Sequence, residues 1–396
     1  MEATPDFTNT TPVAWLKPTD QNVTVKGDGK STWFIFNTQQ TGYYRVNYEK
    51  ENWANLAKHL KKNKVDSIHV LNRAQLIDDA LNMARSNRLN YTDALELTLY
   101  LNKEADYVPW QTAFRNLNFL QNMLRSTNFY DTFKLYVRHI MKEVTKVVGF
   151  EPKKDEPDLT KVFRINVLKW ACRAGDEGCT KYATNQLKAW LKNSTAPLDV
   201  DLKNAIVCAG VRSQDEPIWD QTFKAVVESV KDEDLRKTAL ASLACSESAV
   251  ILKNYLLSSL KENASVTFDA VAQAIVSEHP KGADIVLDVL NSEYETIKKL
   301  NNGEDVIKTS INIVGSAITN KDQFVELSTL LVKQGLKGDV LQAAVTLATK
   351  NIEWINSHVG TIENWMDTHE VQLNSASSLA ITSFLVLISV FITRFY

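Results

Sequence analysis

The chain has 396 residues, of which 44% are hydrophobic and 23% are charged, and its formal net charge is -2. These values are ordinary for a soluble globular protein, and the length allows two or three domains or one long solenoid. The lack of a basic excess gives no reason to expect a nucleic-acid partner. Only 13 Gly and 9 Pro interrupt the chain, which indicates long helices.

Short aromatic and β-branched runs in residues 1–50 predict a few β-strands. The runs are Val13–Trp15, Asn22–Val25, Trp33–Asn37 and Tyr43–Asn47. Turns are expected at 26–30 and at Thr41-Gly42. So few strands cannot bury one face of a sheet by themselves. We therefore expect a partial β-sandwich that packs on helices or on strands from elsewhere.

From about residue 51 the hydrophobic pattern changes to the helical period of 3.6 residues. Thr92 is a candidate N-cap, and residues 320–323 and 339–342 resemble capping boxes. The basic cluster at 58–64 is interpreted as the solvated end of a helix, with a binding patch as the alternative. After a charged loop at 151–158, helices are expected at 160–174, 178–192, 200–210, 217–230, 232–244, 247–261, 267–279, 282–300, 305–318, 321–335, 340–358 and 361–372.

Helices that are paired through short loops stack into a superhelix. No strict repeat is present in the sequence. The predicted fold class is therefore mainly α: an irregular α-superhelix of paired helices, HEAT/armadillo-like, preceded by a partial β-sandwich. The alanine-rich face at 341–348 is expected to allow close helix packing in the core.

Two features indicate the secretory route, although the N-terminus carries no signal peptide. One is a set of Asn-x-Ser/Thr sequons, which are candidate glycosylation sites, at Asn9, Asn22, Asn90, Asn193 and Asn263. The other is an even set of four cysteines, at Cys172, Cys179, Cys208 and Cys245. Four cysteines permit three disulfide pairings, and four buried free thiols are the alternative.

The apolar run 379–392 near the C-terminus is broken only by one Thr and two Ser, and small residues precede it. It is shorter than the ~20 apolar residues of a spanning helix. A cleaved GPI-attachment signal fits better, with Asn374 or Ser375 as the attachment residue. A short single span and a buried C-terminal helix are the alternatives. Either anchor would place the folded chain on the extracellular face of the plasma membrane, so we expect a missing N-terminal portion with a secretory start.

A helical zinc site of the His-Glu-x-x-His type needs two histidines four residues apart, so that both imidazoles lie on one face. No two of the six histidines have this spacing. His369-Glu370 begins such a motif, but Asn374 is not a suitable second ligand. The chain also has no Walker loop, dinucleotide fingerprint or nucleophile elbow. We therefore name no catalytic residue and no metal ligand.

The block Gly42-Tyr43-Tyr44-Arg45-Val46-Asn47-Tyr48 resembles the signature that closes the β-sandwich in M1-family zinc aminopeptidases, the gluzincin aminopeptidase N group. The resemblance extends through 33–37, 52–53, 71–80 and 351–355, and it includes the spacing of the cysteines. It covers the C-terminal half of these enzymes. The tail makes the chain most similar to insect membrane-anchored aminopeptidase N. The family's Gly-x-Met-Glu-Asn motif is absent.

The resemblance implies three parts: a partial β-sandwich domain at 1–50, an α-helical C-terminal domain at 51–373, and a hydrophobic GPI-attachment signal or membrane anchor at 374–396. It implies disulfides Cys172–Cys179 and Cys208–Cys245. It also implies a domain that caps the zinc domain and encloses a substrate chamber. The full-length enzyme would bind zinc and remove N-terminal residues from peptides, whereas this chain has no cofactor of its own and should be inactive alone.

The resemblance also implies the partners. They are the missing N-terminal catalytic domain, peptide substrates and, through the C-terminal anchor, the membrane. The family adds a homodimer and a bacterial toxin as further candidates. The alternative function is a stand-alone, non-catalytic surface glycoprotein module that binds peptides or protein ligands.

Overall fold

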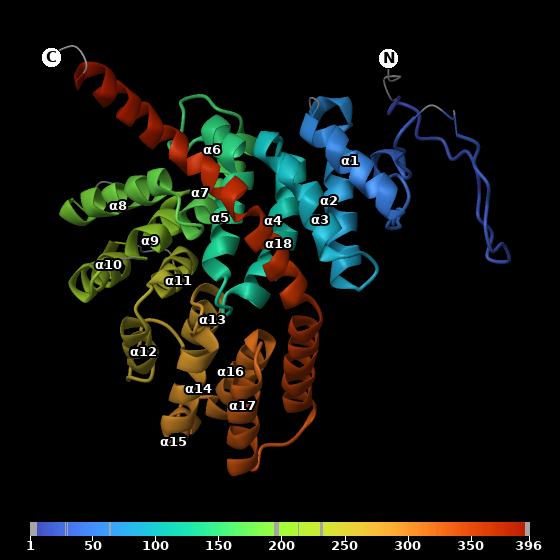
Figure 1. Cartoon of the computed structure of the whole chain (residues 1–396). Coiled ribbons are helices and arrows are strands. Elements are labelled where there is room, and N and C mark those ends of the chain that lie inside the picture. The colour runs from blue at the N-terminus through green and yellow to red at the C-terminus, as the bar shows by residue number, and fades with distance from the viewer. Residues whose placement is uncertain are drawn as a thin grey trace. The chain divides into compact units, whose positions relative to one another are not determined.

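The computed structural model describes residues 6–27, 29, 31–62, 65–193, 198–212, 214–229 and 233–392, and it is mainly helical (Figure 1). The chain forms two compact units. Unit 1 consists of residues Met1–Asn118, Leu135–Gly149 and Thr361–Tyr396. Unit 2 consists of Phe119–Lys134 and Phe150–Gly360.

The helices of the first part of the chain are α1 Lys50–Lys62, α2 Val70–Arg85, α3 Tyr91–Thr98, α4 Tyr107–Leu124, α5 Tyr130–Ile140 and α6 Lys142–Val148. They are followed by α7 Asp158–Arg173, α8 Glu177–Lys192, α9 Lys203–Val211, α10 Glu216–Ser229, α11 Glu233–Ser242, α12 Ala249–Ser258, α13 Phe268–Glu278, α14 Gly282–Ser292, α15 Tyr294–Lys298, α16 Gly303–Ala317, α17 Lys321–Lys333 and α18 Asp339–Ile392. Short 3-10 helices are η1 Thr38–Gln40, η2 Val65–Ser67, η3 Leu99–Lys103 and η4 Leu243–Cys245.

The strands expected in residues 1–50 are not seen in the described part of that segment, which is extended chain with bends and η1. Its backbone groups pair with side chains instead of a neighbouring strand. The Asn52 side chain accepts a hydrogen bond from Phe34 N and donates one to Phe34 O, both at 3.0 Å. Tyr48 Oη accepts from Phe36 N at 2.9 Å. These side chains satisfy the groups that a sheet would otherwise pair.

Unit 1 is held together by large apolar side chains from several helices. α3 packs on α1 and α2, and α6 packs on η3. Trp110 and Tyr136 have no exposed surface, and the Tyr136 ring meets Trp365 of α18 edge to face, with ring centroids 5.7 Å apart. α1 ends in a basic turn, as predicted, with His59, Lys61 and Lys62.

Unit 2 has one continuous apolar core, which runs from Leu187 to Ala348. Neighbouring helices in sequence are neighbours in space: α8 packs on α9, α13 on α14, and α15 on α16 (Figure 1). Polar atoms of the core aromatics are paired, since Trp219 Nε1 donates to Leu243 O at 3.0 Å and Tyr255 Oη to Leu240 O at 3.1 Å. The prediction of a mainly helical chain with successive short helices is therefore confirmed.

The predicted break between residues 358 and 361 is wrong, because α18 continues through Gly360. A single glycine in a helix costs only about 1 kcal/mol relative to alanine, and the hydrogen-bond ladder on either side outweighs it. Of the predicted alanine-rich face, Leu341, Ala344 and Ala348 are buried, as expected for core positions. Ala343 and Leu347 are exposed, so the prediction is wrong for these two residues. Within the described residues, no helix combines the length and the apolar character that crossing a bilayer requires.

Candidate functional site

The signature block at 42–48 begins with a glycine that lies against the Tyr44 ring. A Cβ on Gly42 would lie 2.3 Å from that ring, so the exposed Tyr44 side chain would have to move. Asn37 closes this turn, because its Oδ1 accepts from Gly42 N at 2.7 Å and its Nδ2 donates to Gly42 O at 2.9 Å. Asn37 itself has a φ of 58°, a left-handed conformation that asparagine adopts more readily than most residues.

The rest of the block is fastened to α2, the helix that carries the second similar segment. Arg45 Nη2 lies 2.7 Å from Asp78 Oδ2, and Val46 N donates to Asp79 Oδ2 at 3.1 Å. Asn72 Oδ1 accepts from Gln39 N at 2.9 Å. The two segments that carry the family resemblance are therefore two sides of one polar junction. Sequence reasoning named both segments but did not foresee that they bind each other.

Asp79 is the buried carboxylate of this junction. Its side chain is only 2% exposed. Burial raises its pKa to about 6, although the hydrogen bonds from Val46 and Gln75 oppose this shift. A carboxyl group with this pKa changes charge close to neutral pH. The neighbouring acid Asp78 raises this pKa further, and we assign Asp79 to the junction because it accepts hydrogen bonds from Val46 and Gln75.

Arg73 of α2 forms the other buried polar centre of unit 1. Its Nε donates to Glu104 Oε2 at 2.6 Å, and its Nη1 donates to Ile68 O at 2.8 Å. Asp106 contacts Nη2 as well. This forked donor satisfies one fully buried carboxylate and ties η2, α2 and the start of α4 together.

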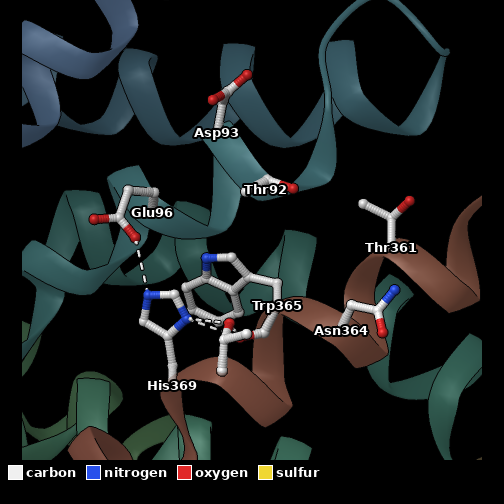
Figure 2. Close-up of a pocket in the computed structure, with 8 residues that line it drawn as sticks. Thr92, Asp93, Glu96, Thr361, Asn364, Trp365 and His369 are labelled. Carbon is white, nitrogen blue, oxygen red and sulfur yellow. Dashed lines mark hydrogen bonds and ion pairs between the residues drawn. The ribbon is translucent and has the colours of Figure 1, made fainter.

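A polar groove of about 470 Å³ lies between α3 and α18 within unit 1 (Figure 2). Its floor is the Trp365 ring, on which the His369 ring stacks with centroids 4.3 Å apart. The remaining lining residues are Thr92, Asp93, Glu96, Thr361, Asn364 and Thr368. The groove therefore brings two carboxylates and one imidazole to the same surface.

Two titratable groups of the groove, His369 and Glu96, already contact each other. His369 Nδ1 lies 2.7 Å from Trp365 O, and Nε2 lies 3.4 Å from Glu96 Oε2 (Figure 2). Lys61 of α1 also contacts Glu96. Each ring nitrogen of His369 thus has an oxygen atom as its neighbour. These contacts link α18 to α3, and we assign them to helix packing rather than to acid–base catalysis.

The N-cap of α3 differs from the predicted one. The helix begins at Tyr91, and Asn90 is the cap: its Oδ1 accepts from Thr92 N at 2.9 Å and from Thr92 Oγ1 at 3.0 Å. Thr92, the predicted cap, is therefore inside the first turn. The available signal was the asparagine itself, which is among the strongest capping residues. Asn90 remains exposed while it caps the helix.

The remaining predicted site residues are the candidate glycosylation and GPI-attachment positions. The asparagines of all five sequons are exposed: Asn9, Asn22, Asn90, Asn193 and Asn263. Asn374 and Ser375 fall within α18, and their side chains lie outside the described residues.

Both disulfides that the resemblance implies are present. Cys172–Cys179 joins the end of α7 to the start of α8, and Cys208–Cys245 joins α9 to η4. Among the described residues, potential metal-ligand atoms of Cys208, Cys245 and Glu278 lie close together. These residues do not fit a zinc site, because both sulfur atoms are bonded to each other and neither is a thiolate.

Comparisons with known proteins agree with this structure. Residues 33–353 match the family model described as the ERAP1-like C-terminal domain. The chain is 30% identical to aminopeptidase N of Plutella xylostella over 373 residues, which covers 91% of this chain and 39% of the relative. It is 28% identical to aminopeptidase Ey of Gallus gallus, with the same coverage.

A third relative is the thyrotropin-releasing hormone-degrading ectoenzyme of Rattus norvegicus, at 25% identity over 89% of this chain and 34% of the relative. The chain thus spans less than half the length of each of these relatives. The family match covers most of the chain, including both sides of the polar junction. The chain therefore belongs to the ERAP1-like C-terminal domain family and corresponds to the C-terminal part of an M1-family aminopeptidase.

Proposed function

We propose that this chain is the capping and substrate-chamber domain of a cell-surface zinc metalloaminopeptidase that removes N-terminal residues from peptides. The match of residues 33–353 to the C-terminal domain family carries this proposal, and the aminopeptidase names of the relatives support it. The successive helix pairs of unit 2 also support it, because paired helices stack into superhelices with a concave face.

In this role the domain would close over a separate catalytic domain and control the entry of peptides. The zinc ligands would belong to that other domain, and this chain would be inactive alone. Its own contribution would be to exclude water from the chamber and to hold the catalytic domain through a large surface.

A complementation experiment tests the proposal. The Plutella xylostella relative is produced without the region that matches this chain, and hydrolysis of a chromogenic leucine anilide is measured with and without added chain. We expect the added chain to bind the truncated enzyme and raise its activity at least several-fold. If the two proteins neither associate in size-exclusion chromatography nor change the rate, the capping role is excluded. Hydrolysis by this chain alone would also contradict the proposal.

We further propose that the protein is an N-glycosylated, GPI-anchored surface protein. The exposure of all five sequon asparagines and the small residues before the apolar run 379–392 support this. The full chain is expressed in insect cells behind a cleavable signal peptide. Release by phosphatidylinositol-specific phospholipase C and a mass loss with a glycosidase are the expected results. Retention on the cell after phospholipase treatment would argue for a spanning anchor instead.

A further inference from the structure

A set of buried cations in unit 2 is poorly balanced by negative charge. Arg173 at the end of α7 bonds to Glu278 at the end of α13. Arg212 Nη2 lies 3.9 Å from Glu278 Oε2, and Lys169 Nζ lies 3.7 Å from Glu278 Oε1. Three cations thus share one carboxylate that is itself 13% exposed.

Arg125, which follows α4, adds a fourth cation to this set. Its electrostatic neighbours are Tyr130, Arg173 and Glu278. Its side chain is buried, and among the described residues no acceptor takes a hydrogen bond from its guanidinium; Nη1 is fully enclosed. Glu247 adds negative charge on the Arg212 side, so four cations face two carboxylates.

Two more N–H groups of these arginines also lack a hydrogen-bond acceptor. The Nε atoms of Arg173 and Arg212 are buried and make no hydrogen bond in the described structure. A buried donor without an acceptor destabilises the folded state, and more so when it is charged. Buried Arg164 also has an Nε without an acceptor among the described residues, but both of its Nη groups donate to one carboxylate, that of Glu156. In the described structure no carboxylate accepts a hydrogen bond from Arg125 in this way.

Deprotonation does not relieve the charge. Burial lowers the pKa of Arg125 to about 10, with a further contribution from Arg173, so the group is still charged at neutral pH. Burial raises the pKa of Glu278, but Arg173 and Lys169 outweigh it and keep that pKa below its ordinary value. Arg125 therefore keeps its positive charge at neutral pH, and the cations around Glu278 favour the charged form of its carboxylate.

We propose that Arg125, Arg173 and Arg212 form a binding site for a small oxyanion, either inorganic, such as phosphate, or the carboxylate of an organic molecule. Guanidinium groups are planar forked donors whose spacing matches two oxygen atoms of such an anion. The anion would accept from the buried N–H groups and offset the excess positive charge. Lys169, whose side chain is 46% exposed, marks where the cluster reaches solvent. This site does not depend on the proposed peptidase role.

Thermal unfolding of the full chain tests the site. Phosphate and acetate are titrated separately against chloride at constant ionic strength and pH 7. A ligand that binds only the folded state raises the melting temperature in a saturable way, by about 2–4 °C when binding is worth about 1 kcal/mol. A rise with phosphate alone assigns the site to inorganic oxyanions, whereas a rise with acetate as well assigns it to carboxylates too.

Two variants separate the site from general salt effects, because phosphate also stabilises proteins non-specifically. Arg125→Gln should remove the saturable rise. Arg115→Gln, which removes an exposed arginine of α4, should keep it. Equal melting temperatures of the wild-type chain in all three anions would overturn the proposal, and so would a full rise in Arg125→Gln. If Arg125→Gln does not fold, a saturable phosphate isotherm with the wild-type chain by calorimetry supports the site, and its absence overturns it.

Discussion

Arg73 is a buried arginine of unit 1 whose guanidinium bonds to two carboxylates and to backbone carbonyls. It is 2% exposed, and its main partner Glu104 is 1% exposed. Sequence similarity placed Arg73 in a family segment, but nothing local to 71–80 indicated that the carboxylate 31 residues away would be its partner. Local patterns predict helices because their bonds are local, whereas ion pairs depend on how helices pack.

Replacing Arg73 with methionine should destabilise the protein strongly. The variant keeps the apolar volume but leaves the Glu104 carboxylate buried and unpaired, which costs about 3–5 kcal/mol. Arg45→Met is the matched control, because the pair of Arg45 with Asp78 has the arginine 49% exposed, and exposed pairs contribute less than about 1 kcal/mol. The free energy of unfolding is measured by urea titration. Equal losses for the two variants would contradict the assignment.

Asp79 should make stability depend on pH in an unusual direction. Its pKa in the folded protein is about 6, above the ordinary value of 3.8, so the folded state binds the proton more tightly than the unfolded state. Stability from this group is therefore greatest below pH 3.8 and is lost as pH rises through 6. The loss by pH 7 is of the order of 3 kcal/mol.

Asp79→Asn removes this titration. We expect the variant's stability relative to the wild-type chain to improve between pH 4 and pH 7, as measured by urea midpoints at several pH values. Glu49→Gln, which removes an exposed carboxylate nearby, controls for the change in net charge. A stability difference between Asp79→Asn and wild type that does not vary with pH would show that the Asp79 pKa is not raised.

The sequence was enough to predict helices, but it was not enough to predict strands. Expected helices at 178–192 and 321–335 agree with α8 and α17 to within two residues at each end. The cap at Asn320 was also recognised, and its Oδ1 accepts from Gln323 N at 3.0 Å. A strand, in contrast, requires a partner elsewhere in the chain. At Phe34 the side chain of Asn52 takes that place, which no period-2 pattern could reveal.

A glycine allows a close approach between the helices α16 and α18. A Cβ on Gly315 would lie 2.7 Å from Ala344 Cβ and 2.8 Å from its backbone. Gly315→Ala should therefore destabilise the protein by about 1–3 kcal/mol, because the helices must move apart. Gly360→Ala in α18 is the control: nothing lies within 4 Å, so the better helix former should add up to about 1 kcal/mol. Thermal melting distinguishes the two, and a stabilising Gly315→Ala would refute the close approach.

The chain is divided into two units, and the disulfides stabilise only one of them. Both bridges lie within unit 2, and both link helices of its core. Unit 1 has none, and buried ion pairs and aromatic contacts hold its helices. The sequence indicated the cysteines and the helices but contained no signal for two units, because residues 361–396 and 135–149 join unit 1 only through packing.

Removal of the longer bridge should therefore loosen unit 2 and leave unit 1 unchanged. The bridges close loops with sequence separations of 37 and 7. In the chain-entropy account, losing the longer one costs about 4 kcal/mol and losing the shorter one about 2.4 kcal/mol. The double variant Cys208→Ala with Cys245→Ala should show faster amide hydrogen exchange in α9, α11 and α13 by mass spectrometry. Exchange in α1 and α2 should stay at the wild-type rate.

The pair Cys172→Ala with Cys179→Ala should give the same pattern with a smaller effect. Equal acceleration of exchange in α1 and α2 would instead show that the two units unfold together.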